Sequence, residues 1–225
     1  AGKNDTIFHY SPNGRDDGAL LLNYGPLLEV TASALYKNFN LDPLPTRHLV
    51  ITLFTFLLFL FAGLTGKQIG GWRAGTIAML FMVLAPRILG EAFNNPKDPP
   101  FAAGYMMAIF ALIYYFEQLP KPTWKATLLL MLGIGLAFAI RVGGLLLYAY
   151  LGLFLLIALL SNEEWKKKLL AFDFTYYRPL IISLLVVFFG SWIIGIITWP
   201  AALKAPFTHP FYALQVQIGR ASCRE

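Results

Sequence analysis

The chain has 225 residues, of which 57% are hydrophobic and 13% charged, and its net charge is +6. A soluble domain carries about twice that charged fraction. The apolar residues fall in runs of about 15 to 22 residues, and a helix needs about 20 residues to cross a bilayer core. These features exclude an ordinary soluble domain and predict an all-α integral membrane protein with about six transmembrane helices.

Residues 1–47 are predicted to be a loop outside the membrane followed by an amphipathic helix. Residues 1–17 are polar and rich in Gly, Pro and Asn, which is typical of a loop. A helix is expected from about Pro26, since proline suits the first helical position. Periodicity alone does not distinguish a helix lying on the membrane surface from one with a soluble-facing polar side. The residues that recur at helical spacing and form a stripe are Leu27, Leu28, Thr31, Leu35 and Phe39.

Residues 48–199 are predicted to form the transmembrane bundle. The crossings are expected at about 48–66, 74–85, 101–116, 126–160 and 180–199, with a tight turn after the first. Residues 200–217 are expected to begin a further segment on the outer face. Residues 218–225 match the translation of a common sequencing adapter and are interpreted as an artefact, and we expect the chain to be a fragment cut at both ends.

The run from Ala126 to Leu160 is too long for one crossing. Its 35 residues would extend about 50 Å as a single helix and would place Arg141 near mid-membrane, at a cost of at least about 2.5 kcal/mol. We therefore predict two shorter crossings with a hairpin at Arg141.

The distribution of basic residues supports this topology. With a hairpin at Arg141, the basic residues of three loops between crossings all fall on one side, which the positive-inside rule makes cytoplasmic: Lys67, Arg73, Lys121, Lys125, Lys166, Lys167, Lys168 and Arg178. Because these residues lie between apolar runs and not on one polar face, no nucleic-acid partner is expected. The N-terminal loop, the loop after residue 85 and Arg141 then share the outer side.

The loop from Ala85 to Phe101, APRILGEAFNNPKDPPF, is the most polar stretch between apolar runs. Long cations at membrane ends often reach the interface without any function. Together with Arg141, however, Arg87 and Lys97 would suit an anionic phosphate, with the amides of Asn94 and Asn95 in support.

Two carboxylates in this loop, Glu91 and Asp98, are candidates for catalysis. A carboxylate at a membrane surface can act as a general base, a metal ligand or a partner for a nearby cation. For Glu91 the expected partners are Lys97 or Arg87. Asp98 precedes an apolar run, so it can also serve as an acid at a helix N-terminus.

Three stretches carry a family resemblance: RHLVITLFTFLLFLFAGLTGKQIGGWRAG, APRILGEAFNNPKDPPFAAGY and FAIRVGGLLL. The chain from Thr46 to Leu156 resembles membrane glycosyltransferases of the GT-C type. In particular, it is similar to bacterial relatives of the dolichyl-phosphate-mannose protein mannosyltransferases (glycosyltransferase family 39). Within these stretches, NNPKD is the most specific piece.

The resemblance implies transfer of a sugar from a polyprenyl-phosphate carrier to an acceptor on the outer face of the cytoplasmic membrane. It implies an acid that begins a crossing after an upstream arginine, which Asp98 and Arg87 match. Tyr24 opens a Tyr-Gly-Pro-Leu element similar to the family's His-Pro-Pro-Leu. The family's first-loop acid is expected upstream of residue 1, with Asp16 and Asp17 as weak substitutes because adjacent acids beside glycine usually form an exposed turn. A divalent metal is compatible with these residues.

Two other classes of function compete with a transferase. A multi-pass transporter or lipid-binding protein without catalysis also has polar loops and broken helices, but its substrate site lies near the bilayer midplane. A structural membrane anchor explains the crossings and leaves the polar loop without a role. Because nearly all charges here lie at predicted membrane ends, a surface site is favoured.

Overall fold

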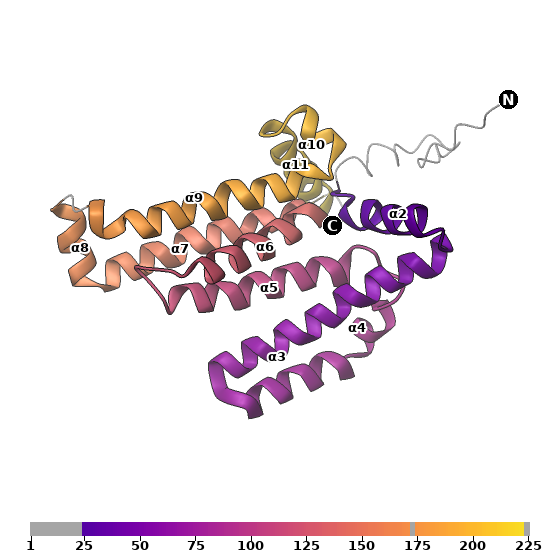
Figure 1. Ribbon diagram of the computed structural model, residues 1–225, viewed down its shortest axis with the longest axis horizontal. Coiled ribbons are helices and arrows are strands. Elements are labelled where there is room, and N and C mark those ends of the chain that lie inside the picture. The colour runs from indigo at the N-terminus through magenta and orange to yellow at the C-terminus, as the bar shows by residue number, and fades with distance from the viewer. Residues whose placement is uncertain (1–23, 172–173, 223–225) are drawn as a thin grey trace.

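The computed structural model describes residues 24–171 and 174–222, and every regular element in this part of the chain is a helix (Figure 1). Four helical stretches are long and apolar enough to cross a membrane: α3 (Pro43–Leu84), α5 (Asp98–Phe116), α7 with its preceding turn (Val142–Ser161) and α9 (Phe174–Ile197). The apolar helix α6 (Trp124–Ile140) is shorter. The predicted all-α membrane fold is confirmed.

Helix α3 consists of two arms joined at Gly70 and Gly71, whose backbone angles are not helical. Gly71 has a φ of 74°, which glycine adopts readily and other residues do not. The arms touch through backbone, since a Cβ added to Gly75 would lie 2.6 Å from the carbonyl oxygen of Gly63. The predicted tight turn is therefore present. The first arm begins at Pro43 and not near residue 48, because a proline in the first turn loses no hydrogen bond.

The helix hairpin predicted at Arg141 is also present. Helix α6 ends at Ile140, and Arg141 has extended backbone angles (φ −142°, ψ 140°). A short 3₁₀ turn, η1 (Val142–Leu145), follows, and α7 (Leu146–Ser161) then runs back along the bundle (Figure 1). The turn is tight, since a Cβ on Gly144 would lie 2.5 Å from the backbone nitrogen of Phe138.

Glycines bring α5 and α6 into contact and fix their register. A Cβ on Gly104 of α5 would lie 2.7 Å from the backbone nitrogen of Ala137, and one on Gly133 of α6 would lie 2.6 Å from that of Ala108. Both contacts belong to one antiparallel register, in which each turn forward on α6 corresponds to one turn back on α5. One further turn toward the C-terminal end of α6 brings Arg141 beside the start of α5.

Helix α2 (Leu27–Phe39) lies at the end of the bundle where α5 starts (Figure 1). Its buried residues Leu28 and Ala32 pack against Val50 and Ile51 of α3. The helix begins within a residue of the predicted position. Phe39, the last residue of the predicted stripe, lies at the end of the helix beyond this contact and is 69% exposed.

The remaining helices are short or differ in their bounds from prediction. Helix α4 (Pro86–Glu91) lies in the polar loop, and α5 begins at Asp98 and not at residue 101. Helix α9 starts before residue 180 and contains Pro179 near its beginning. Helix α8 (Glu163–Leu170) lies at the end opposite α2, whereas α10 (Pro200–Lys204) and α11 (Thr208–Ser222) follow α9 at the α2 end (Figure 1).

Candidate functional site

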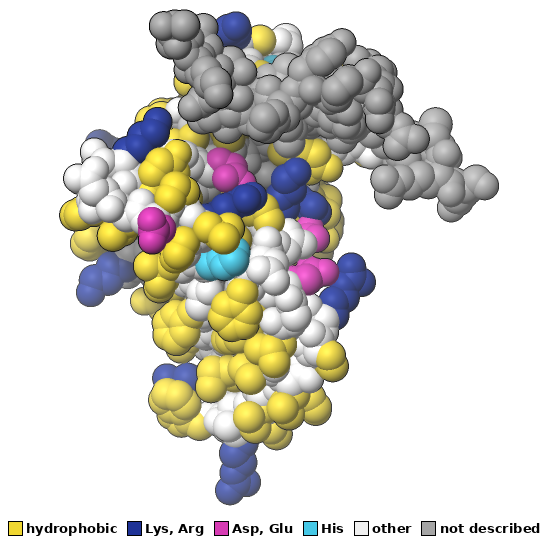
Figure 2. Space-filling model, turned by 90° about the vertical axis from the view of Figure 1, so that its right-hand side faces the viewer, with side chains coloured by type: hydrophobic (Ala, Val, Ile, Leu, Met, Phe, Trp, Pro, Cys, Tyr) yellow, Lys and Arg dark blue, Asp and Glu magenta, His cyan; other side chains and the backbone are white. Residues whose placement is uncertain are grey.

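The candidate site lies at the α2 end of the bundle, where α5 begins and α6 ends (Figure 1). Basic and acidic side chains lie near one another on this end of the molecule (Figure 2). The site is built from the residues before α5, the residue after α6, the start of α2 and the N-terminal part of α3. The predicted candidates Asp16 and Asp17 lie outside the described residues.

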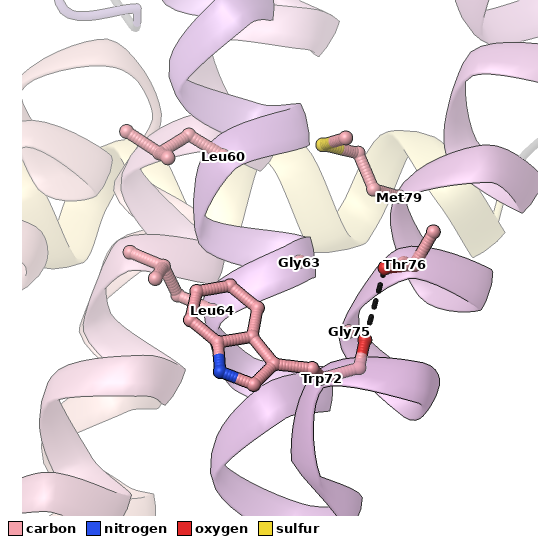
Figure 3. A pocket seen from close by; sticks show the side chains of 7 residues that line it. All are labelled: Leu60, Gly63, Leu64, Trp72, Gly75, Thr76 and Met79. Carbon is pink, nitrogen blue, oxygen red and sulfur yellow. Dashed lines mark hydrogen bonds between the residues drawn. The ribbon is translucent and has the colours of Figure 1, made fainter.

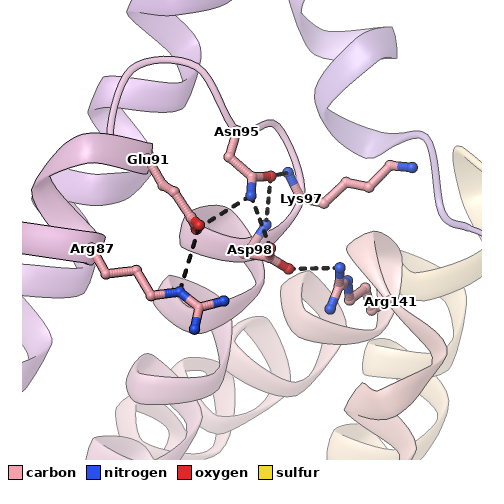
Figure 4. A network of polar contacts seen from close by, with 6 residues as sticks. All are labelled: Arg87, Glu91, Asn95, Lys97, Asp98 and Arg141. Atoms are coloured by element: carbon pink, nitrogen blue, oxygen red, sulfur yellow. Dashed lines mark hydrogen bonds and ion pairs between the residues drawn. The ribbon is translucent and has the colours of Figure 1, made fainter. Parts of the chain in front are cut away.

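Asn95 organises the start of α5 (Figure 4). Its side-chain oxygen accepts hydrogen bonds from the backbone N–H groups of Lys97 (2.9 Å) and Asp98 (3.1 Å). Its side-chain nitrogen donates to Oδ2 of Asp98 (2.8 Å) and to Oε2 of Glu91 (3.3 Å). One amide thus caps the helix and ties both candidate carboxylates together. Asn94 is exposed in the preceding turn.

The loop before α5 is anchored to the first arm of α3. The buried hydroxyl of Thr55 donates to the carbonyl oxygen of Ala92 at 3.1 Å. Pro99 and Pro100 are buried in the first turn of α5. Because proline fixes its own backbone angle, these contacts hold the polar residues between them at the edge of the bundle.

Arg141 forms an ion pair with Asp98, with 2.6 Å between Nη2 and Oδ1. The two side chains are 32% and 43% exposed, so solvent reaches the pair. The Nε atom of Arg141 is buried and has no hydrogen-bond partner among the described residues. Both oxygens of Asp98 are therefore engaged, one by Arg141 and one by Asn95, while Arg141 keeps donors available for an anion.

Lys97 is a half-buried cation that makes no ion pair within the described residues. Its ammonium nitrogen lies 4.2 Å from the ring centroid of Tyr24, and the guanidinium carbon of Arg141 lies 5.8 Å from the same ring. Both distances suit cation–π contacts. Burial, and next the charge of Arg141, lower the pKa of Lys97, although Glu29 and Asp98 oppose this shift. Lys97 is thus a positive group with no described carboxylate in direct ion-pair contact.

Glu29 and Arg47 form a second ion pair beside Lys97 that the sequence analysis did not identify. Nη2 of Arg47 lies 2.7 Å from Oε1 of Glu29. Both charges act on the pKa of Lys97, which places them near its ammonium group. The pair joins α2 to the N-terminal part of α3 across 18 positions of sequence, and neither residue stands in a recognisable motif.

Arg87 stands apart from the other predicted phosphate-binding residues. Its side chain is 89% exposed, and its Nε atom lies 3.6 Å from Oε1 of Glu91. In Figure 4 its guanidinium group points toward Glu91, whereas Lys97 extends away on the other side of Asp98. The expected pairing of Glu91 is therefore with Arg87 and not with Lys97. Within residues 24–171 and 174–222, no group of three His, Cys, Asp or Glu side chains could hold a metal ion.

One comparison with known proteins bears on this site. The chain is 23% identical over 172 residues to the lipopolysaccharide core galacturonosyltransferase RgtA of Rhizobium johnstonii. The chain resembles a glycosyltransferase. This similarity covers 75% of the chain and 33% of the relative, so the chain spans about a third of the length of that glycosyltransferase. No family model and no solved structure matches the chain.

The similarity is to a protein that is named as a glycosyltransferase. It adds to the apolar helices, which support a membrane protein independently of any relative. The aligned region is longer than any single helix described above, so the similarity extends over several elements of the fold.

Proposed function

We propose that this chain is part of a GT-C type membrane glycosyltransferase, related to glycosyltransferase family 39, that uses a polyprenyl-phosphate-linked sugar as donor. The observation that carries this proposal is the half-buried ammonium of Lys97, which forms no ion pair with a carboxylate of the described residues and lies beside Arg141. A phosphate placed between these two cations would neutralise Lys97. It would also accept hydrogen bonds from the guanidinium group of Arg141, whose Nε atom has no partner among the described residues.

In the proposed reaction, the bond between the anomeric carbon of the sugar and the phosphate oxygen breaks. A new bond forms between that carbon and an acceptor hydroxyl oxygen, whose proton passes to a carboxylate. The bonding electrons of the broken bond stay on the leaving polyprenyl phosphate. Lys97 and Arg141 stabilise the negative charge that develops on this phosphate, so they act on the transition state more than on the bound donor.

The two carboxylates take different roles in this proposal. Both oxygens of Asp98 already accept strong contacts, so Asp98 orients Arg141 and holds its charge in place. Glu91 makes longer contacts, at 3.3 Å to Asn95 and 3.6 Å to Arg87, and is the freer proton acceptor among the described residues. Asp16, Asp17 or an acid upstream of residue 1 remains the other proposed base, and a divalent metal would require such an acid as a further ligand.

We further propose that the site faces the outer side of the cytoplasmic membrane. The end of the bundle opposite the site carries the turn of α3, the connection between α5 and α6, and the lysines of α8. Because basic residues accumulate in cytoplasmic loops, this distribution supports an outward-facing site. The relative's name makes a galacturonosyl donor and a lipopolysaccharide core the first substrates to assay.

The proposal is tested with the full-length protein in proteoliposomes supplied with a polyprenyl-phosphate sugar. Transfer to the acceptor is measured for the wild type and for Asp98→Ala, Arg141→Ala and Lys37→Gln. We expect the first two variants to lose transfer while being expressed at normal levels. Lys37→Gln, which removes an exposed cation from α2, should keep it. Transfer retained in both Asp98→Ala and Arg141→Ala would refute the assignment, and transmembrane passage of substrate without transfer would favour a transporter.

A further inference from the structure

A second feature of the molecule lies at the opposite end of α3 from the candidate site. A groove of about 120 Å³ runs between the two arms of the helix, close to its turn (Figure 3). Its lining includes Leu60, Leu64, Trp72, Thr76 and Met79. The hydroxyl of Thr76 donates to the backbone oxygen of Trp72 at 2.9 Å, so this polar side chain is satisfied within its own helix. The wall of the groove is therefore effectively apolar.

The groove opens on the outside of the hairpin. The side chains of Leu60 and Met79 are 38% and 41% exposed, and Trp72 is 71% exposed. In a protein whose apolar helices cross a bilayer, such a surface contacts hydrocarbon chains. Tryptophan at the end of a membrane helix lies at the level of the lipid headgroups, because its ring is apolar and its N–H is polar. Trp72 therefore marks the depth at which the groove reaches the headgroups.

Two cations stand at this mouth of the groove. The ammonium nitrogen of Lys67 lies 3.9 Å from the ring centroid of Trp72, and Arg73 follows Trp72 in the chain with its side chain exposed. Within the described residues, neither cation forms an ion pair. One carboxylate lies near this turn, that of Glu117, which accepts a hydrogen bond from Gln68 at 3.2 Å. With two cations and one acid, the turn of α3 keeps an excess of positive charge.

We propose that this groove binds one anionic phospholipid, with an acyl chain along the apolar wall and the headgroup phosphate between Lys67 and Arg73. The apolar wall would contact the acyl chain, and the two cations would contact the headgroup phosphate. A zwitterionic lipid offers the same phosphate, but its own cation is repelled by the excess positive charge. This site is separate from the proposed transfer reaction, and its failure leaves the glycosyltransferase proposal unchanged.

Native mass spectrometry of the full chain in detergent tests the headgroup contact. Phosphatidylglycerol and phosphatidylcholine with identical acyl chains are titrated separately. We expect the wild type to retain phosphatidylglycerol more tightly. The double variant Lys67→Gln/Arg73→Gln should weaken that binding about 25-fold, since each cation near a membrane surface contributes about fivefold. The matched control Lys121→Gln/Lys125→Gln removes two exposed charges from the same end and should change binding less than about twofold.

The acyl-chain contact needs its own measurement. Thr76→Phe places a large ring in the groove and should weaken phosphatidylglycerol binding, whereas Leu80→Phe, on the same arm but outside the groove lining, should not. Glycerol phosphate, which lacks acyl chains, should fail to displace the lipid from the wild type. Equal retention of the two lipids by the wild type would overturn the proposal without any variant. An equal loss in the control pair, or displacement by glycerol phosphate, would also overturn it.

Discussion

The substitution Lys97→Gln tests the proposed donor site most directly. It removes one positive charge and leaves the side chain nearly the same length. A hydrogen bond between a charged group and its partner contributes about 1.5–3 kcal/mol. Loss of the contact between Lys97 and the donor phosphate should therefore raise the dissociation constant about 10- to 150-fold.

Several features of the site place the effect toward the upper part of this range. Lys97 is half-buried, so solvent screens its charge less than it would at an exposed position. Its ammonium has no carboxylate partner in the described part of the chain, so a bound phosphate does not compete with an existing ion pair. Because Lys97 forms no ion pair with a described carboxylate, its substitution does not leave a carboxylate without its partner. The thermal midpoint should therefore remain close to that of the wild type.

The assay is binding of a polyprenyl-phosphate sugar to the purified full-length protein in detergent, measured by calorimetry. Lys37→Gln on α2 is the matched control, because it removes an exposed lysine charge outside the cluster. Lys97→Arg keeps the charge and should retain most of the affinity. If Lys97→Gln binds the donor as tightly as the wild type, the ammonium of Lys97 does not contact the phosphate, and the reasoning from its missing partner is wrong.

Further outcomes follow from the same geometry. Burial and Arg141 lower the pKa of Lys97. Donor binding should therefore fall as the pH rises through that lowered pKa, at a lower pH than for an ordinary lysine, and Lys97→Arg should bind without this fall. In a double-mutant cycle of donor dissociation constants, Asp98→Ala and Arg141→Ala should be strongly non-additive. The thermal midpoint should change little, because a partly exposed ion pair contributes at most about 1 kcal/mol. Gly25→Ala should lower the free energy of unfolding by about 1–3 kcal/mol, because its Cβ would meet an α6 carbonyl oxygen at 1.9 Å. Gly90→Ala, which meets nothing within 4 Å, should not destabilise the protein in the same denaturation measurement.

Much of the fold was predictable because membrane crossing constrains length and charge together. A 35-residue apolar run with one arginine in its middle leaves few alternatives to a hairpin. The structure has that hairpin. Arg141 contacts Asp98, as expected if the hairpin and the loop before α5 lie on the same side of the membrane. Helix starts were predicted less well. Proline at residue 43 and aspartate at residue 98 extend helices into stretches that composition alone marks as loop.

The details of the site were only partly predictable. The polar composition of the loop was enough to predict Lys97, Asp98 and Asn95 as site residues. The pair of Glu29 and Arg47 was missed because its members lie on different helices, and a single sequence carries no signal of that contact. The separation of Arg87 from the other cations was missed for a related reason. Whether an exposed arginine turns toward Glu91 or toward Lys97 depends on side-chain geometry that residue spacing does not determine.

The glycine contacts between α5 and α6 have a mechanical consequence. Because the two helices meet backbone to backbone at Gly104 and Gly133, neither can slide or rotate without moving the other. In a thinner or thicker bilayer, α5 and α6 would therefore tilt together as one rigid body. Asp98 and Arg141 would keep their spacing while the membrane around them changes, because they lie at adjoining ends of these two helices.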